Sequence, residues 1–242
     1  MELVKTEFGV GVDRGEGGVL ELRHIIGIGR NYAEHAREQG ADLPTRPMVF
    51  TKNPGSACLS GDEIVIPPVC GDADTDGHGG QVDFEAELAV IIGTAAKDVR
   101  EEDALSHVLG YCCGNDVSAR WWQKKGSGGQ FCRGKSFDTF CPLGPRVVAD
   151  SEAGGVQNLR VVCRVNGETM QDGNTSQMIF PVARLISDLS RGTTLMAGTV
   201  IMTGTPSGVG MARDPQVWLK AGDVVEVEIE GLGVLRNGVV RG

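Results

Sequence analysis

Val82-Asp-Phe-Glu-Ala-Glu-Leu-Ala-Val-Ile-Ile92 alternates acidic and apolar side chains over its first half and then continues as an apolar run. Successive side chains of a β-strand point to opposite faces. The stretch therefore predicts a strand with Asp83, Glu85 and Glu87 on one face. The opposite face is wholly apolar, and we expect it to pack into a core.

Carboxylates that follow one another along a strand face lie roughly 7 Å apart and repel each other unless a cation neutralises them. The alternative is a solvated outer face of an antiparallel sheet. Ala89 and Ile91 continue the same face as apolar residues, which favours a local site. A third acid, Asp116, follows the apolar run 108–115. Three carboxylates with no nearby His or Cys pair suit Mg²⁺ or Mn²⁺ better than zinc or copper.

The composition indicates one domain of a mostly β protein with short helices (α+β). The chain has 242 residues, 36 of them Gly, and only 5% are aromatic, while short Val and Ile runs alternate with turn residues. A net charge of −9 without Lys and Arg clusters argues against a nucleic-acid partner. No apolar stretch reaches the ~18 residues of a membrane span, so we expect no membrane partner.

Seven cysteines, an odd number, occur without any C-x-x-C spacing and lie mostly in apolar runs. This usage indicates buried thiols in a reducing compartment. The first residues resemble neither a secretory signal nor a transit peptide, and we therefore expect a cytoplasmic protein.

Along the chain, residues 1–22 predict a short strand or hairpin, and 24–29 a buried strand. Asn31 is a candidate cap for a short helix on which His35 and Glu38, three residues apart, share a face. Further helices are predicted at 98–108, 118–125 and 181–190, and further strands at 47–52, 159–165, 199–203, 224–229 and 233–240.

Asp72-Ala-Asp-Thr-Asp-Gly77, with Asp83 at the twelfth position, matches the ligand spacing of a D-x-D-x-D-G calcium loop. Two prolines precede it and a strand follows, so the two helices of an EF-hand are missing. A solvated acidic turn is the preferred interpretation, and Ca²⁺ remains the alternative.

Five segments, in this order, resemble the fumarylacetoacetate hydrolase family, and the resemblance extends from about residue 23 to the end. They are Gly-Ile-Gly-Arg-Asn-Tyr-Ala-Glu-His (27–35), Asp-Phe-Glu-Ala-Glu-Leu-Ala-Val-Ile-Ile-Gly (83–93), Gly-Asn-Asp-Val-Ser-Ala-Arg (114–120), Gly-Lys-Ser-Phe-Asp-Thr-Phe (134–140) and Thr-Gly-Thr-Pro-Ser-Gly-Val-Gly (203–210). The second half is especially similar to the small stand-alone acylpyruvase, oxaloacetate decarboxylase and oxaloacetate tautomerase enzymes. The resemblance implies an N-terminal extension over 1–22 and a catalytic domain over 23–242.

The resemblance also implies a mixed β-sheet roll, a homodimer and a site built from nine residues. It assigns the metal ligands to Glu85, Glu87 and Asp116, the catalytic roles to Lys135 and to a water-activating pair of His35 and Glu38, and substrate binding to Arg120, Gln123 and Thr205. It gives Asp83 no ligand role. The Gly- and Asp-rich stretch 71–81 departs from the family pattern on the side of the pocket that carries a lid.

These residues suit a short 2-oxo acid, whose carboxylate and oxo oxygens chelate a divalent ion that stabilises the enolate. Lys135 and Arg120 are the candidate cations that prevent repulsion of an anionic substrate, and His35 is the candidate general base. The predicted reaction is C–C bond hydrolysis of an acylpyruvate or decarboxylation of oxaloacetate. The alternative is keto–enol tautomerisation or isomerisation of oxaloacetate or a related 2-hydroxy-diene-dioate. The motifs do not separate these reactions, and for Thr205 a purely structural turn is the alternative.

Overall fold

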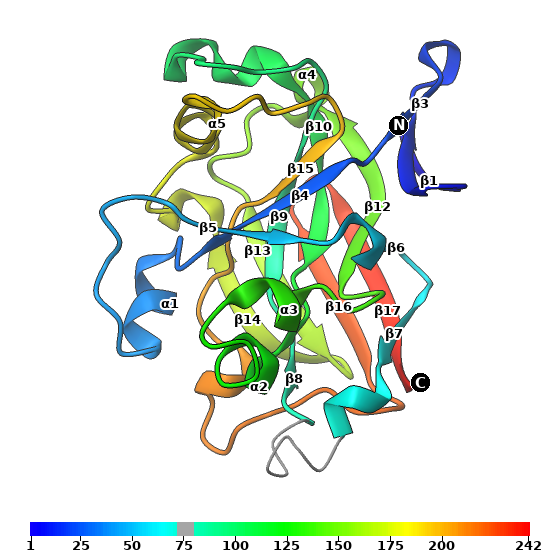
Figure 1. Cartoon of the computed structure of the whole chain (residues 1–242), viewed down its shortest axis with the longest axis vertical. Helices are drawn as coiled ribbons and strands as arrows, with labels where there is room; N and C mark the ends of the chain where they lie inside the picture. Colours follow the sequence, from blue (N-terminus) through cyan, green and yellow to red (C-terminus); the bar gives the residue numbers. More distant parts are fainter. Residues whose placement is uncertain (72–79) are drawn as a thin grey trace.

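A seven-stranded mixed sheet carries the acidic stretch near its centre (Figure 1). The computed structural model describes residues 1–71 and 80–242. The sheet order is β5-β4-β15-β9-β10-β12-β6, with parallel pairing of β4 with β15 and of β6 with β12. Its strands are β4 (His24–Gly29), β5 (Met48–Lys52), β6 (Ala57–Leu59), β9 (Ala86–Ile92), β10 (Val108–Asn115), β12 (Cys141–Ala149) and β15 (Thr199–Met202).

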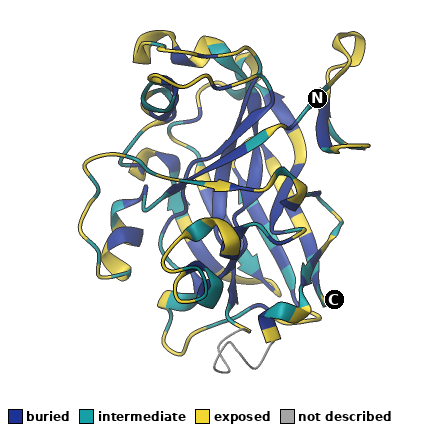
Figure 2. Ribbon diagram, viewed as in Figure 1, coloured by how far each residue is buried: buried dark blue, intermediate teal, exposed yellow. Residues whose placement is uncertain are grey.

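A five-stranded sheet packs across one face of the first. Its order is β14-β13-β16-β17-β7, and its strands are β7 (Glu63–Ile66), β13 (Arg160–Val165), β14 (Glu168–Asn174), β16 (Val224–Ile229) and β17 (Gly233–Arg241). β13 and β16 contact β9, and β16 and β17 contact β10. The strands of both sheets are largely buried and the surrounding loops are exposed (Figure 2). The mostly β class, with a curled mixed sheet, is therefore confirmed.

The alternation along the acidic stretch is confirmed, with two corrections. Leu88 and Val90 belong to the core between the two sheets, whereas Ala89 and Ile91 belong to a second core on the opposite face. Both faces of β9 are thus buried, because the strand lies in the middle of the sheet. The predicted single strand is also interrupted. At residues 84–86 side-chain oxygens of the neighbouring segments accept two of the backbone N–H groups, and the chain leaves the ladder.

The segment before this interruption forms a separate ladder. β8 (Val82–Asp83) pairs with β11 (Ser118–Ala119) outside the large sheet. Asp83 therefore does not continue the row of Glu85 and Glu87, and the prediction that all three acids share one strand face is wrong.

Residues 1–22 form a three-stranded antiparallel sheet of β1 (Glu2–Thr6), β2 (Gly9–Asp13) and β3 (Val19–Glu21). Val10, Val12 and Leu22 bury their side chains in the second core, against the face of the large sheet that carries Ala89. The predicted hairpin is present, and it covers that face.

The helices are short. They are α1 (Ala33–Glu38), α2 (Arg120–Gln123), α3 (Phe131–Lys135), α4 (Asp150–Ala153) and α5 (Val182–Ser190). The helix predicted over 98–108 is a 3₁₀ helix, Glu101–His107. Asn31 is not the cap of α1, because its side chain bonds the backbone of Phe180 and the carbonyl oxygen of Thr203, and so ties the start of the helix to two distant loops.

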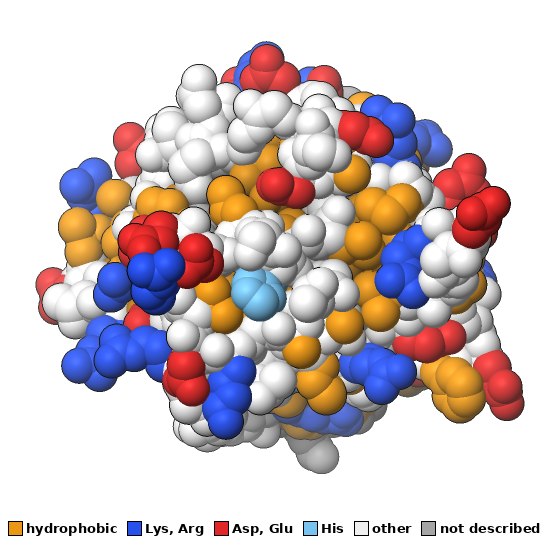
Figure 3. Space-filling model, turned by 90° about the horizontal axis from the view of Figure 1, so that it is seen from above, with side chains coloured by type: hydrophobic (Ala, Val, Ile, Leu, Met, Phe, Trp, Pro, Cys, Tyr) orange, Lys and Arg blue, Asp and Glu red, His pale blue; other side chains and the backbone are white. Residues whose placement is uncertain are grey.

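The surface carries mixed charge. On the face drawn in Figure 3, acidic, basic and apolar side chains are scattered with no large area of a single charge. Within the described residues, no helix is long and apolar enough to span a membrane. The residues proposed as a calcium loop, 72–77, lie outside the part of the chain that the structure describes.

Candidate active site

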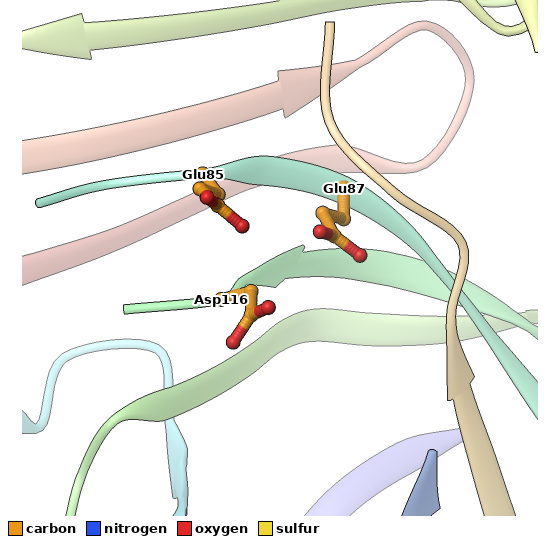
Figure 4. Close-up of side chains that lie close together, drawn as sticks. All are labelled: Glu85, Glu87 and Asp116. Atoms are coloured by element: carbon orange, nitrogen blue, oxygen red, sulfur yellow. The ribbon is translucent and has the colours of Figure 1, made fainter. Parts of the chain in front are cut away.

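Three acids lie close together where β9 begins and β10 ends (Figure 4). β9 and β10 are antiparallel, and their register brings the start of one beside the end of the other. The Asp116 N–H donates to the Glu85 carbonyl oxygen at 2.9 Å, which fixes the offset between the two segments. All three acids are buried, and one carboxylate oxygen of each lies within 4.8 Å of the others. We call Glu85, Glu87 and Asp116 the acid cluster.

Two lysines and an arginine surround the acid cluster. Lys135 Nζ lies 2.8 Å from Glu85 Oε2 and 2.5 Å from Asp116 Oδ2, and Lys52 Nζ lies 2.5 Å from Asp116 Oδ1. Arg120 reaches Glu85 Oε1 at 2.7 Å. Burial opposes the charged form of Glu85, but Lys135 and Arg120 outweigh it and hold the pKa of this carboxyl well below its usual range.

The position of Lys135 depends on a close approach of two helices. A Cβ at Gly134 would lie 2.4 Å from the backbone nitrogen of Gln123, so a larger residue would push α3 away from α2. Burial lowers the proton affinity of the Lys135 amine, whereas Asp116 and Glu85 raise it, and the net effect is a raised pKa. The ammonium form is therefore the one that faces the acids.

Glu87 has no ion-pair partner in the described part of the chain. It accepts one hydrogen bond, from the Gly204 N–H at 2.8 Å. Burial, followed by repulsion from Asp116 and Glu85, raises its pKa well above the usual range. A buried carboxylate beside two other acids is unfavourable unless a further cation binds it. The acid cluster therefore fits a divalent ion with oxygen ligands.

His35 and Glu38 meet on α1 as the sequence predicts. Glu38 Oε1 lies 2.6 Å from His35 Nδ1, and Glu38 Oε2 accepts the Gly208 N–H at 2.9 Å. His35 Nε2 lies 2.8 Å from the side-chain amide nitrogen of Gln39. With Nδ1–H donating to Glu38, Nε2 is the basic nitrogen of the ring, and the Gln39 amide donates to it.

One pocket brings together seven of the nine predicted residues; Glu38 and Asp116 are outside its lining and bond to His35 and Lys135, which line it. His35, Glu85, Glu87, Arg120, Gln123, Lys135 and Thr205 line it, together with Arg30, Gln39 and the aromatic rings of Phe50 and Phe131. The Thr205 hydroxyl donates to the Ala86 carbonyl oxygen and accepts from Gln171, so it serves the loop structure. Gln123 accepts from Arg120 through Oε1, and its amide N–H groups, which make no hydrogen bond to the described residues, are available to a ligand.

Asp83 anchors Arg120, which lines the pocket. Its carboxylate accepts from Arg120 Nε and from the backbone N–H groups of Gly210 and Met211. Arg120, which the resemblance places at the substrate, is thereby fixed between Asp83 and Glu85. In this structure Arg120, together with Asp83, links the acid cluster to the loop that follows β15.

We expect Asp83→Asn to lower the free energy of unfolding by about 3 kcal/mol, because it leaves a buried guanidinium short of a counter-charge. Urea denaturation measures the loss. Asp172→Asn is the matched control, since Asp172 pairs with Arg160 at the surface, and it should have little effect. Equal losses in the two variants would contradict the assigned role of Asp83.

Two cations were missed from the sequence: Lys52, which bonds Asp116 of the acid cluster, and Arg30, which lines the pocket. Lys52 ends β5, and the alternation that buries it extends from Met48 and Phe50, so the strand period signals an inward lysine. Arg30 follows β4 within the first family-like segment, and no pattern marks it. Lys52 pairs with an acid 64 positions away, and only the fold reveals such a contact.

Comparisons with known proteins agree with this geometry. The family described as fumarylacetoacetate (FAA) hydrolase C-terminal matches residues 24–240. Human mitochondrial oxaloacetate tautomerase FAHD2A is 45% identical over 216 residues, which cover 89% of this chain and 66% of that protein. The chain thus spans slightly less than two thirds of the length of this relative.

Two solved structures are similar in fold and sequence. A fumarylacetoacetate hydrolase from Exiguobacterium antarcticum superposes with a TM-score of 0.80 and 43% identity, covering 93% of this chain and 79% of that one. Fumarylpyruvate hydrolase from Pseudomonas aeruginosa, solved in complex with Mn²⁺ and pyruvate, superposes with a TM-score of 0.83 and 30% identity and covers the whole of both chains.

Proposed function

This chain belongs to the fumarylacetoacetate (FAA) hydrolase C-terminal family, and on that basis we propose that it is a divalent-metal-dependent enzyme acting on the enolate of short 2-oxo acids. One observation carries the proposal: three buried carboxylates lie within 4.8 Å of one another, and two of them, Glu85 and Glu87, line a pocket together with the buried Lys135. A dry site of this kind makes electrostatic stabilisation of an enolate effective.

Glu85, Glu87 and Asp116 would hold the ion, for which we propose Mg²⁺ or Mn²⁺. The Mn²⁺ in the similar fumarylpyruvate hydrolase supports this choice. Bound there, the ion would withdraw charge from the oxo group of the substrate and stabilise the enolate.

The protein groups supply orientation and proton transfer. Lys135 presents a positive charge beside the acid cluster, and the free amide of Gln123 lies on the same pocket wall. His35 Nε2 accepts a proton once the Gln39 amide moves aside, and Glu38 stabilises the imidazolium through Nδ1. Lys135, His35 and Glu38 are the catalytic groups of this proposal.

Two classes of reaction are candidates for this site: proton relocation, and cleavage of a C–C bond by hydrolysis or decarboxylation. Keto–enol tautomerisation of oxaloacetate is supported by the name of the human relative and needs only the relocation of one proton. C–C bond hydrolysis of an acylpyruvate, or decarboxylation of oxaloacetate, is the second candidate, and the His35–Glu38 pair favours the hydrolysis because it can activate water. Tautomerisation is the reaction we test first.

The test follows enol-oxaloacetate loss and pyruvate formation in parallel, with added Mg²⁺ or Mn²⁺ and with a chelator. Metal-dependent enol loss without pyruvate indicates a tautomerase, whereas stoichiometric pyruvate indicates a lyase, and an acylpyruvate series then tests hydrolysis. Enol loss that the chelator leaves unchanged would contradict the proposed metal dependence.

We expect His35→Ala to lower acylpyruvate hydrolysis by about a hundredfold, because a general base contributes on this scale. Tautomerisation of enol-oxaloacetate should fall much less, because it does not require an activated water molecule. His107→Ala is the control, since His107 lies outside the pocket lining. Equal loss of both activities in His35→Ala would make His35 the proton carrier of both reactions.

Location and assembly are further parts of the proposal. The proposed location is the cytoplasm, and the predominantly buried free thiols suit a reducing compartment. A homodimer is the proposed assembly, and a monomer mass by light scattering at micromolar concentration would contradict it.

A further inference from the structure

Arg30 is a cation of the pocket that forms no ion pair with any carboxylate of residues 1–71 and 80–242. It lies between β4 and α1, it lines the pocket beside His35 and Lys135, and its side chain is half-buried. Its Nε is shielded from solvent and makes no hydrogen bond to the described residues. A buried guanidinium N–H without an acceptor is costly, and it marks a place where a ligand group can bind.

The other pocket cations differ from Arg30 in this respect. Arg120 pairs with Asp83 and Glu85, and Lys135 pairs with Glu85 and Asp116. No described carboxylate forms an ion pair with Arg30. The positive charges of Arg120 and Arg30 also act on Lys124. The pKa of Lys124 is lowered mainly by burial and then by these two arginines.

The charges of the site explain what Arg30 would bind. With Glu87 ionised, as binding of a metal ion requires, the acid cluster and Asp83 carry four negative charges, and Lys52, Lys135 and Arg120 carry three positive ones. A divalent ion turns the remaining negative charge into one positive charge, which the first carboxylate of a 2-oxo acid neutralises. A second carboxylate then requires another cation.

We propose that Arg30 binds the distal carboxylate of a dicarboxylic 2-oxo acid and thereby makes the pocket selective for oxaloacetate-like substrates over monocarboxylic ones. The inference rests on the proposed function, because it assumes that the first carboxylate and the oxo group lie at the acid cluster. Arginine suits the task, since its planar fork can bind a carboxylate through two parallel hydrogen bonds.

The backbone keeps Arg30 at the pocket. Arg30 has a φ of +55°, in the left-handed region that favours glycine, so its conformation is imposed by its surroundings. Asn31, the next residue, is anchored to the carbonyl oxygen of Thr203 at 2.7 Å and to the backbone of Phe180. These bonds tie the arginine to the loop that carries Thr205, another residue of the pocket.

The test measures the binding of malate and lactate to the Mn²⁺-loaded protein by calorimetry. Both ligands carry a 2-hydroxy acid, and only malate has a distal carboxylate. We expect the wild type to bind malate at least about tenfold more tightly than lactate, as a charge-assisted hydrogen-bonded pair provides. Arg30→Gln should abolish this preference and leave lactate binding and Mn²⁺ affinity unchanged.

Arg37→Gln is the matched control, because it removes an exposed arginine of α1 that does not line the pocket. It should keep the full malate preference, and Arg30→Lys should keep part of it. Equal affinity of the wild type for malate and lactate, no malate binding at all, or equal weakening of both ligands in Arg30→Gln would overturn the proposal.

The binding test and the activity test fail separately. A wild type that leaves enol-oxaloacetate unchanged contradicts the proposed function, whereas a malate preference that depends on Arg30 still supports the assignment of Arg30. Conversely, an active enzyme whose Arg30→Gln variant retains the malate preference keeps its proposed function and refutes the role of Arg30.

Discussion

Replacing Glu87 by glutamine is expected to lower the Mn²⁺ affinity by at least about a hundredfold, since loss of even an outer partner of a metal ligand costs 10–100-fold. Glu87 is the member of the acid cluster without a described cationic partner, and burial and its acidic neighbours raise its pKa. A divalent ion would relieve the repulsion between Glu87 and its acidic neighbours. The neutral amide of the glutamine variant takes no part in such repulsion, so the variant gains less from binding the ion. Enol-oxaloacetate tautomerisation should fall with the lost affinity.

The same substitution should leave the metal-free protein folded, because glutamine keeps the shape of the side chain and can still accept from the Gly204 N–H. Thermal unfolding with and without Mn²⁺ tests this. Saturation at about 100 times the dissociation constant should stabilise the wild type by about 2.7 kcal/mol and the variant by much less. Glu228→Gln serves as the control, because Glu228 is a partly exposed residue of β16 that pairs with Arg164. Equal stabilisation of wild type and Glu87→Gln by Mn²⁺ would exclude Glu87 as a ligand.

Replacing Lys135 by methionine should reduce kcat/KM for the proposed reaction by about a thousandfold, because removing a single donor to a developing oxyanion costs on the order of 10²–10³ in rate. Lys135 bonds Glu85, Asp116 and the Ser118 hydroxyl, and it lines the pocket. Its loss also leaves two buried acids short of a counter-charge. We expect a loss of about 3 kcal/mol in the unfolding free energy.

Lys52→Met separates the two effects. Lys52 bonds the same Asp116 carboxylate and is equally buried, but it does not line the pocket. The two variants should therefore lose similar stability, measured by urea denaturation. At saturating Mn²⁺ the Lys52→Met variant should recover most of its kcat, and Lys135→Met should not. Similar kcat values for the two variants would assign Lys135 a purely structural role.

The local pattern of the sequence predicted the acid pair correctly, because strand period two is a local property. Leu88 and Ala89 do lie in different cores, and Glu85 and Glu87 do lie together. Asp83 was grouped with them wrongly. The strand breaks after it, because Asn115 and Gln171 accept N–H bonds that a continuous ladder would have used.

Long-range pairings could not be predicted from the local pattern. The contact of Lys52 with Asp116 and the bonds of Asn31 to Phe180 and Thr203 join segments that are far apart in the chain. His35 and Glu38 were predictable as neighbours, since three positions on a helix suffice. The assignment of these two residues and of Arg120 to the site was predicted from the family resemblance. The distances between their atoms come from the fold.

Electron paramagnetic resonance of Mn²⁺ added to the wild-type protein tests the acid cluster most directly, because bound and free ions give different signals. We predict one bound ion per chain at micromolar concentrations, and a further change of the bound signal when oxalate, which offers two neighbouring carboxylate oxygens, is added. A spectrum that remains that of the free ion, or a bound signal that oxalate leaves unchanged, would contradict a metal-dependent 2-oxo acid site.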